Sequence, residues 1–271
     1  NITTEKEKIV EILNSQFKSV FNEIETIDES QLFLANSTSN LCNTNDLLSL
    51  ITHENIISKL NNLDETKSCG RDGVQSIVLK RAAIGFVKPL ELLFKSSITT
   101  SMLPDEWLVA NVTPLFKNGS KLDPSNYRPV SLTSIICKII ERIVKDFILE
   151  YLLKNKLICS AQHGFMPGRS CTTNLLESLD YITSDIARGH QVDVIYLDFA
   201  KAFDKVPHNM LLVKLKTYGI SDNLLNWIKG FLNDRKQKVV MGCVESNWAR
   251  VTSGVPQGSV LGPLLFFYIY K

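Results

Sequence analysis

Residues 194–206 of the chain are VIYLDFAKAFDKV, a segment that combines an apolar run with two acidic residues. An apolar run ends at Asp198, and a second acid, Asp204, follows six residues later. The pattern over residues 192–199 predicts a strand buried on at least one face, with Asp198 at its carboxyl-terminal edge. Such a carboxylate is costly to bury unless a cation offsets its charge, so it suits a divalent metal ion. The alternative from these residues alone is that Asp198 caps the helix that follows.

The composition is that of an ordinary globular protein. Of the 271 residues, 44% are hydrophobic and 21% charged, which allows one large domain or two smaller ones. Residues 1–67 carry 5 basic and 11 acidic side chains, a net charge of −6, whereas residues 68–271 carry 25 and 17, a net charge of +8. The basic part permits a polyanionic partner, but a solvated surface of mixed charge explains it equally well.

Cysteine usage and the apolar runs favour an intracellular protein without a membrane span. The six cysteines contain no Cys-x-x-Cys pair and are interpreted as reduced packing residues. The longest apolar run, residues 261–270, is interrupted by Pro263 and falls short of the roughly 18 residues that a span needs. Because the chain starts at Asn1 and stops inside this run, we expect a piece of a longer reading frame, with residues 261–270 forming an exposed apolar surface.

Periodicity places most elements. Residues 2–29, with Thr3 or Thr4 as N-cap, and residues 47–63 predict an acidic helical arm joined by a flexible linker at 36–46. Residues 107–121 predict a strand that ends in a turn, and with the extended residues 126–132 they predict a hairpin; residues 235–251 predict a second hairpin that turns near Gly242. Residues 134–153 form the clearest amphipathic helix; Glu141 is assigned to its charged face, and the helix is given no chemistry. Further helices are expected over residues 87–100, 173–188 and 222–233, and two more are expected to begin near Ser76 and Pro207.

Five motifs in this order resemble those of reverse transcriptases, in the form found in non-LTR retrotransposons of the jockey-like and long-interspersed-element type. They are SCGRDGV (68–74), NYRPVSLTSIICKIIERI (126–143), QHGFMPGRS (162–170), YLDFAKAFDKVPH (196–208) and SGVPQGSVLGPLLF (253–266). The resemblance covers residues 68–271. It implies an α+β fold: the fingers and an incomplete palm of a right-hand polymerase, with an antiparallel sheet, preceded by the arm of residues 1–67.

The resemblance also implies roles for residues around Asp198. Asp198 corresponds to the first metal-binding aspartate, with the Phe199 backbone carbonyl as the ligand beside it. Two Mg²⁺ ions would activate the primer 3′-hydroxyl and stabilise the leaving pyrophosphate in the complete protein. Phe203 stands where the family keeps an aromatic ring under the sugar, which would favour deoxynucleotides. From the residues alone, Phe203 could equally be a core side chain.

Cations and turn residues in the other motifs complete the predicted site. A hairpin would place Lys117 and Arg128 on one face, where they could grip a triphosphate; the alternative is two surface cations. The resemblance puts Gln257 beside the incoming nucleotide or the template base. Weaker contacts with template or primer are implied for Gln162, Gly164, Arg169 and Gly258. The basic run of Arg235, Lys236 and Lys238 could follow a phosphate backbone or simply be solvated.

Two departures limit the prediction. Asp204 and His208 receive structural roles, Asp204 as a helix N-cap or salt-bridge partner. The family's aromatic-Ala-Asp-Asp motif is not in the sequence, so we expect no polymerase activity from this chain alone. The resemblance implies that the partners are an RNA template, a DNA primer and deoxynucleoside triphosphates, and that the protein does not bind a membrane. It also implies a location in the cytoplasm and nucleus. The alternatives are a non-catalytic nucleic-acid-binding remnant and an unrelated magnesium-dependent phosphotransfer enzyme.

Overall fold

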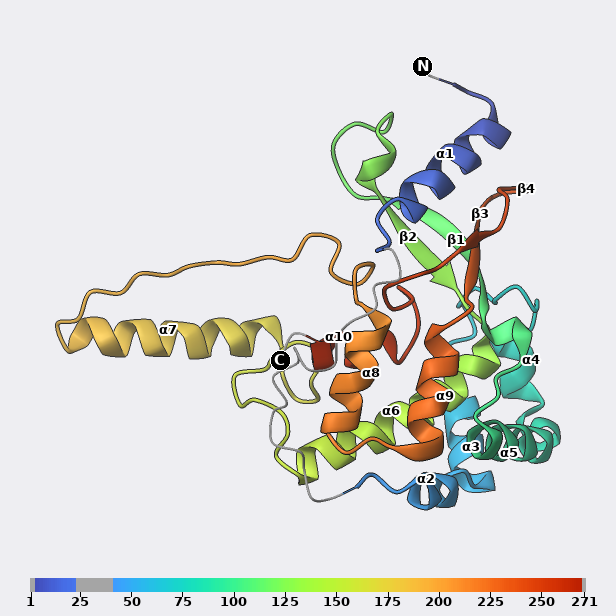
Figure 1. The fold of residues 1–271 in the computed structure, drawn as a ribbon, viewed down its shortest axis with the longest axis horizontal. Helices are drawn as coiled ribbons and strands as arrows, with labels where there is room; N and C mark the ends of the chain where they lie inside the picture. The colour runs from blue at the N-terminus through green and yellow to red at the C-terminus, as the bar shows by residue number, and fades with distance from the viewer. Residues whose placement is uncertain (1–2, 23–40, 270–271) are drawn as a thin grey trace.

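The computed structural model describes residues 3–22 and 41–269, which form ten α-helices and five strands (Figure 1). The helices are α1 (Lys6–Lys18), α2 (Thr44–Leu50), α3 (His53–Asn61), α4 (Ser76–Arg81), α5 (Ala83–Thr100), α6 (Ile135–Lys154), α7 (Cys171–Ala187), α8 (His208–Thr217), α9 (Asp222–Leu232) and α10 (Gly262–Ile269). The strands are β1 (Val109–Phe116), β2 (Tyr127–Leu132), β3 (Lys236–Met241), β4 (Val244–Glu245) and β5 (Ala249–Arg250). The fold is therefore mixed α and β, as expected.

The sheet is small and mixed rather than antiparallel as predicted. Its order is β2-β1-β3-β4, with β5 also paired to β3. β1 and β2 are antiparallel, with Phe116 opposite Tyr127. β1 and β3 are parallel, with Val109 opposite Lys236. The difference has a topological cause: short turns force antiparallel pairing within each predicted hairpin, but β1 and β3 are joined through a long crossover of helices, which permits a parallel pair.

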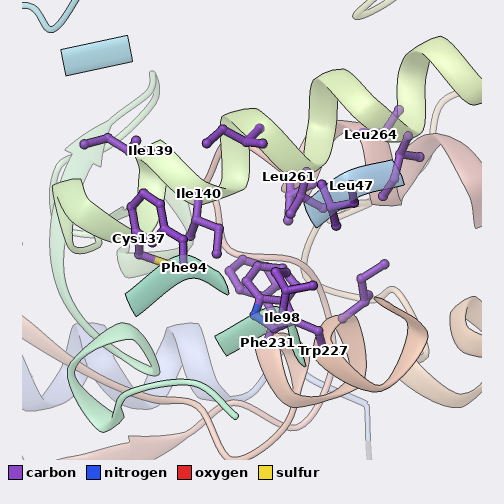
Figure 2. Packing of buried hydrophobic residues seen from close by; sticks show 14 of the residues in the cluster. Leu47, Phe94, Ile98, Cys137, Ile139, Ile140, Trp227, Phe231, Leu261 and Leu264 are labelled. Atoms are coloured by element: carbon purple, nitrogen blue, oxygen red, sulfur yellow. The ribbon is translucent and has the colours of Figure 1, made fainter. Parts of the chain in front are cut away.

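The main core lies between the helices below the sheet. Ser134 caps α6 by accepting a hydrogen bond from the Cys137 backbone N–H, as Ser and Thr do at helix starts. Figure 2 shows side chains of α5, α6 and α9 converging in this core, with Leu47 of α2 and Leu261 and Leu264 beside them. The Trp227 indole N–H donates to Ser97 Oγ at 2.9 Å, so this core polar group is satisfied.

The acidic region does not stand apart as an arm where the structure describes it. Residues 47–63 form two helices rather than one, because Thr52 caps α3 and interrupts the run. Leu47 and Leu60 are buried in the main core. α1 packs on the sheet through Val10, Leu13 and Phe17 in a second, small core. Its N-cap is Glu5, not Thr3 or Thr4. The helix predicted over residues 2–29 ends at Lys18, and residues 19–22 after it are not helical. Residues 23–29 of that prediction and residues 36–40 of the linker lie outside the described residues, while residues 44–46 of the predicted linker already belong to α2. The domain boundary at 67/68 stays a prediction.

The predicted strand at residues 192–199 is wrong. This segment has no strand partner among the described residues and its apolar side chains face solvent: Ile195 is 82%, Tyr196 90% and Leu197 89% exposed. A strand satisfies its backbone groups through neighbouring strands, so an apolar sequence alone cannot produce one. In Figure 1 the segment is a long extended trace between α7 and α8, and α7 projects away from the other helices.

The position of the exposed apolar surface was also predicted wrongly. Residues 261–270 were expected to be exposed, but Leu261, Leu264, Leu265 and Tyr268 are buried, because α10 enters the main core. Exposed apolar side chains occur at scattered positions, such as Ile84 and Met102, and they are concentrated on α7 and the segment after it. All six cysteines are unpaired, as predicted, although Cys159, Cys171 and Cys243 are exposed and do not pack in a core. None of the helices within residues 3–22 and 41–269 is long and apolar enough to span a membrane.

Candidate functional site

One pocket gathers most of the side chains singled out in the sequence. It has a volume of about 680 Å³ and is formed by the β1–β2 hairpin, residues 198–204, the loop at 256–258 and Pro263 of α10. The predicted residues that line it are Lys117, Arg128, Asp198, Phe199, Phe203, Gln257 and Gly258. These come from distant parts of the chain, so their meeting is a property of the fold and not of sequence proximity.

The β1–β2 hairpin supplies the two cations, as the sequence predicted. Lys117 follows β1 directly, and its backbone N–H donates to the Asn126 carbonyl at 2.9 Å. Arg128 lies on β2 opposite Leu115. Both side chains are exposed at the pocket, and neither forms an ion pair with any other described residue. Two unneutralised cations on a rigid hairpin can bind an anion, Arg128 by a forked pair of hydrogen bonds and Lys117 as a point charge.

The two carboxylates that line the pocket, Asp198 and Asp204, differ in their availability to a metal ion. Asp198 is exposed, whereas Asp204 is buried and its side chain is already engaged by a protein donor. No group of three His, Cys, Asp or Glu side chains suited to a metal ion occurs within the described residues. Mg²⁺ requires about six oxygen ligands, some of them water. Asp198 with the Phe199 carbonyl can therefore contribute ligands, but the described residues do not complete the set.

Phe203 is held in place by two other aromatic rings. It stacks on Phe266 of α10, with ring centroids 4.7 Å apart and planes 13° apart. The Phe165 ring meets it edge-on at 6.1 Å. Phe203 is half-buried and also lines the pocket. The packing alternative is therefore confirmed, and the ring also borders the pocket; its contact with a sugar stays a prediction.

Asp204 holds Gln257, a role that the sequence did not suggest. Its Oδ1 accepts a hydrogen bond from Gln257 Nε2 at 2.9 Å. Asp204 is not a helix cap, because the N-cap of α8 is Pro207, and it forms no ion pair with another described residue. Burial raises the pKa of the Asp204 carboxyl above its usual value, while the hydrogen bond from Gln257 and the charge of Lys201 act in the opposite direction. Two motifs nearly fifty residues apart thus meet side chain to side chain.

The backbones of these two motifs are also joined. Gly254 N–H donates to Val206 O and Val255 N–H to Phe203 O, both at 2.8 Å. His208 Nε2 donates to Gly254 O at 2.7 Å. Gly254 has φ +85°, and a Cβ there would lie 2.6 Å from Phe203 O, so only glycine fits. His208, assigned a structural role from the sequence, is confirmed as part of this junction.

The other side of the same loop rests on β2. The Ser131 N–H donates to Gln257 O at 2.8 Å. Gly258 has φ +119°, and a Cβ there would lie 2.5 Å from Ser131 O. Gly258 is therefore required for the close approach of the loop to β2. The loop that carries Gln257 is fixed between β2 and residues 203–208.

Glu141 is a structural anchor that the sequence reading missed. It was assigned to the charged face of α6, but it is completely buried. Its Oε2 accepts from the backbone N–H groups of Val260 at 2.7 Å and Leu261 at 3.0 Å, just before α10 begins. A signal was present: Cys137, Glu141, Val144 and Ile148 are separated by four, three and four residues, the spacing of the buried stripe.

Arg235 also differs from its predicted position. It was grouped with Lys236 and Lys238 in a basic run, but its side chain is buried and donates to the Phe231 carbonyl at 3.0 Å. Burial raises the pKa of Glu141, while its two backbone hydrogen bonds and the charge of Arg235 lower it. Arg235 is therefore a buried countercharge near Glu141 and not a surface contact for phosphate.

Three of the four weaker template candidates, Gln162, Gly164 and Arg169, lie outside the pocket, whereas Gly258 lines it. Gln162 Nε2 donates to the Gly164 carbonyl at 2.9 Å. Arg169 Nη1 lies 2.9 Å from His163 Nε2 and 3.3 Å from Glu177 Oε2. This network fixes the 162–170 loop to the start of α7, so part of the charge of Arg169 is already neutralised. A contact of these residues with template stays a prediction.

The arrangement of a cationic hairpin, an exposed carboxylate and an aromatic floor around one pocket is suited to the class of protein that binds phosphorylated ligands. Comparison with known proteins supplies the particular family. Residues 116–270 match the family model described as reverse transcriptase (RNA-dependent DNA polymerase). This match includes more than half of the chain, and the chain belongs to that family.

Several curated proteins are similar to the chain. It is 28% identical over 220 residues to the probable RNA-directed DNA polymerase from transposon BS of Drosophila melanogaster, covering 79% of this chain and 24% of that protein. It is 29% identical over 220 residues to the RNA-directed DNA polymerase from mobile element jockey of the same species, covering 81% and 24%. A type-1 retrotransposable element R2 polyprotein of Popillia japonica is 30% identical over 200 residues, covering 73% and 27%. The chain thus spans about a quarter of the length of these relatives.

Proposed function

We propose that the protein acts as the nucleotide-binding part of an RNA-directed DNA polymerase of the non-LTR retrotransposon type. In this reaction the 3′-hydroxyl oxygen of a DNA primer attacks the α-phosphorus of a deoxynucleoside triphosphate opposite an RNA template, and pyrophosphate leaves. The observation that carries the proposal is the single pocket that gathers Lys117, Arg128, Asp198, Phe203 and Gln257. The names of the relatives favour a polymerase over a non-catalytic remnant, and no observation favours the remnant.

Each lining residue then has a role that its chemistry supports. Lys117 and Arg128 hold the triphosphate, because fixed cations stabilise the charge that develops in phosphoryl transfer. Phe203 lies under the sugar, where its ring leaves no room for a 2′-hydroxyl; its stacking on Phe266 keeps that ring from moving aside. Gln257 lies beside the nucleotide or the template base.

Divalent metal ions supply Lewis-acid chemistry in enzymes of this family. We assign Asp198 and the Phe199 carbonyl as ligands for Mg²⁺, with two ions in the whole protein. The described residues fit this role only in part, since a single exposed carboxylate lines the pocket. The proposal is that the whole protein supplies the remaining ligands of the two ions.

The rest of the proposal concerns the whole protein. Residues 68–271 would form fingers and part of a palm, with the template and primer passing near Gln162, Gly164, Arg169 and Gly258. The partners would be an RNA template, a DNA primer and deoxynucleoside triphosphates. The element's life cycle would place the protein in the cytoplasm and nucleus.

Nucleotide binding to this chain tests the proposal without requiring catalysis. Fluorescence anisotropy of a labelled deoxynucleoside triphosphate in Mg²⁺ buffer would measure the dissociation constant. We expect Lys117→Ala and Arg128→Ala each to weaken binding about tenfold or more, because a charge-assisted hydrogen bond contributes about 1.5–3 kcal/mol. Arg128→Lys should weaken it less than Arg128→Ala. Lys88→Ala, an exposed cation on α5 that does not line the pocket, is the matched control.

Two outcomes would overturn the assignment. One is the absence of measurable triphosphate binding by the folded wild-type chain. The other is equal affinity in wild type, Lys117→Ala and Arg128→Ala. Phe203→Ala tests the sugar contact separately: it should narrow the preference for deoxyribonucleotides over ribonucleotides, measured with the same assay.

A further inference from the structure

Asp204 and Gln257 form a side-chain contact at this site whose orientation has a chemical consequence. Gln257 is half-buried and lines the pocket, and Asp204 is buried behind it. The Gln257 amide can present either its nitrogen or its oxygen to a neighbour, because the two ends have nearly the same shape. Its partner therefore decides which end faces the ligand.

An ionised carboxylate next to Gln257 allows only one orientation of its amide. It has acceptor atoms and no hydrogen to donate, so it can bind the amide nitrogen but repels the amide oxygen. The observed contact, Gln257 Nε2 to Asp204 Oδ1 at 2.9 Å, has this orientation. An asparagine or serine in the same place could both donate and accept, and so would allow either orientation. The Asp204 carboxylate thus fixes the orientation of the Gln257 amide in addition to forming a hydrogen bond with it.

The carboxylate is not needed to hold the loop itself. The loop backbone is fixed by bonds that do not involve the Asp204 side chain: Gly254 N–H to Val206 O, Val255 N–H to Phe203 O, and Ser131 N–H to Gln257 O. Farther along, Glu141 binds the N–H groups of Val260 and Leu261. None of these hydrogen bonds involves the Asp204 side chain. Anchoring of the loop therefore does not explain why a carboxylate is buried at position 204.

We propose that Asp204 is a positioning residue: its carboxylate holds the Gln257 amide with the nitrogen inward, so that the amide oxygen serves as a hydrogen-bond acceptor for the nucleotide. Asp204 would therefore act through Gln257 and not touch the ligand. This inference rests on the proposed function for its ligand, a nucleoside triphosphate, but the orientation of Gln257 can be measured without any ligand.

The test compares Asp204→Asn and Asp204→Ala with wild type by two measurements. The first is the side-chain amide signal of Gln257 in chain labelled with ¹⁵N-glutamine, identified by its loss in Gln257→Ala. We expect Asp204→Ala to move this signal to the position of a solvated glutamine. In Asp204→Asn it should broaden or split, because both orientations become possible. Asp193→Asn, at an exposed aspartate outside the pocket, should leave it unchanged.

The second measurement is the affinity for the labelled deoxynucleoside triphosphate. If Asp204 acts through Gln257, Asp204→Ala and Gln257→Ala should each weaken binding by a similar factor of about tenfold, and the double variant should be no weaker than either. Asp204→Asn should fall between wild type and Asp204→Ala. A thermal melt of each variant shows that the loss occurs in folded protein, and Asp204→Asn, which keeps the side-chain shape, provides the comparison if Asp204→Ala does not fold.

The outcomes separate this proposal from the proposed function. An unchanged Gln257 signal in Asp204→Asn and Asp204→Ala would overturn the positioning role. So would additive losses of affinity in the double variant, because they would mean that Asp204 acts on its own. A wild-type chain that binds no triphosphate would refute the proposed function, while the Gln257 signal would still decide whether Asp204 orients that side chain.

Discussion

At the scale of single residues, the buried Glu141 carboxylate is the charge on which the loop before α10 depends. The sequence did not suggest this role, although it did indicate Lys117, Arg128, Phe203 and Gln257, which line one pocket. Glu141 was assigned to the wrong face because an acidic residue in a helix is almost always exposed unless it is paired. Its partners, two backbone N–H groups more than a hundred residues away, leave no trace in the sequence around it.

Removing the Glu141 carboxylate should destabilise the protein strongly. Glu141→Ala leaves the N–H groups of Val260 and Leu261 without an acceptor and Arg235 without its nearby countercharge, which should cost about 3 kcal/mol or more of unfolding free energy. Glu141→Gln keeps an acceptor oxygen and should cost less. Urea denaturation measures both. Glu150→Ala, at an exposed position of α6, should change the free energy by about 0.5 kcal/mol or less; equal effects at positions 141 and 150 would refute the anchoring role.

His208 should make the stability depend on pH. Burial lowers its pKa below the usual 6.5, so the folded protein favours the neutral ring that donates to Gly254 O. Between the lowered pKa and 6.5 the unfolded chain binds more protons, and stability is therefore lost as the pH falls below about 6.5. His208→Gln keeps a donor but does not titrate.

Urea denaturation at pH 7.5 and pH 5.5 checks this. The loss of stability on acidification should be smaller in His208→Gln than in wild type, whereas His190→Gln, at an exposed histidine, should behave as wild type. The comparison between variants matters because Asp204, whose pKa is raised, changes stability in the opposite direction with pH. Identical pH dependence in His208→Gln and wild type would contradict the expectation.

At the scale of elements, local signals placed those elements that need only their own residues or a short turn. α6 begins after its capping Ser134, close to the predicted start of the helix. The pairing of β1 with β2 places Lys117 and Arg128 on one face of the hairpin, as predicted. The strand predicted at residues 192–199 failed because pairing depends on a neighbour that the described residues do not provide. The same limit explains the mixed sheet: the parallel pairing of β1 with β3 depends on the path of the chain between them.

The exposed apolar side chains of α7 and residues 192–199 should contribute almost nothing to stability in this chain. Leu176→Gln and Ile195→Gln remove apolar groups that already face water, so the unfolding free energy should change by about 0.5 kcal/mol or less. Binding of a hydrophobic dye should decrease, because less exposed apolar surface remains. Leu215→Gln, at a buried position of α8, should destabilise by several kcal/mol as the contrast.

A destabilisation of more than about 1 kcal/mol by Leu176→Gln or Ile195→Gln would show that these side chains are covered in solution. Hydrogen exchange gives independent information. The backbone N–H groups of residues 194–199 should exchange rapidly, as expected for a segment without strand pairing, whereas those of α6 should be protected.

At the scale of the whole molecule, the fold brings together the residues proposed to bind the nucleotide but only some of the oxygen ligands that the proposed metal ions require. The hairpin, the aromatic floor and the Gln257 loop are joined by the hydrogen bonds described above and form a preorganised pocket. Of the two carboxylates that line it, Asp204 is committed to Gln257 and only Asp198 is exposed. Two Mg²⁺ ions require more oxygen ligands than this.

We therefore expect residues 1–271 to bind deoxynucleoside triphosphates without incorporating them. A primer-extension assay with an RNA template, a DNA primer and Mg²⁺ should show no product above the level of Asp198→Ala. The binding assay on the same preparation should still show the losses predicted for Lys117→Ala and Arg128→Ala, which distinguishes an incomplete catalytic centre from an unfolded protein. Template-dependent incorporation that Asp198→Ala abolishes would overturn this expectation, because a single exposed carboxylate in the pocket would then suffice for nucleotidyl transfer.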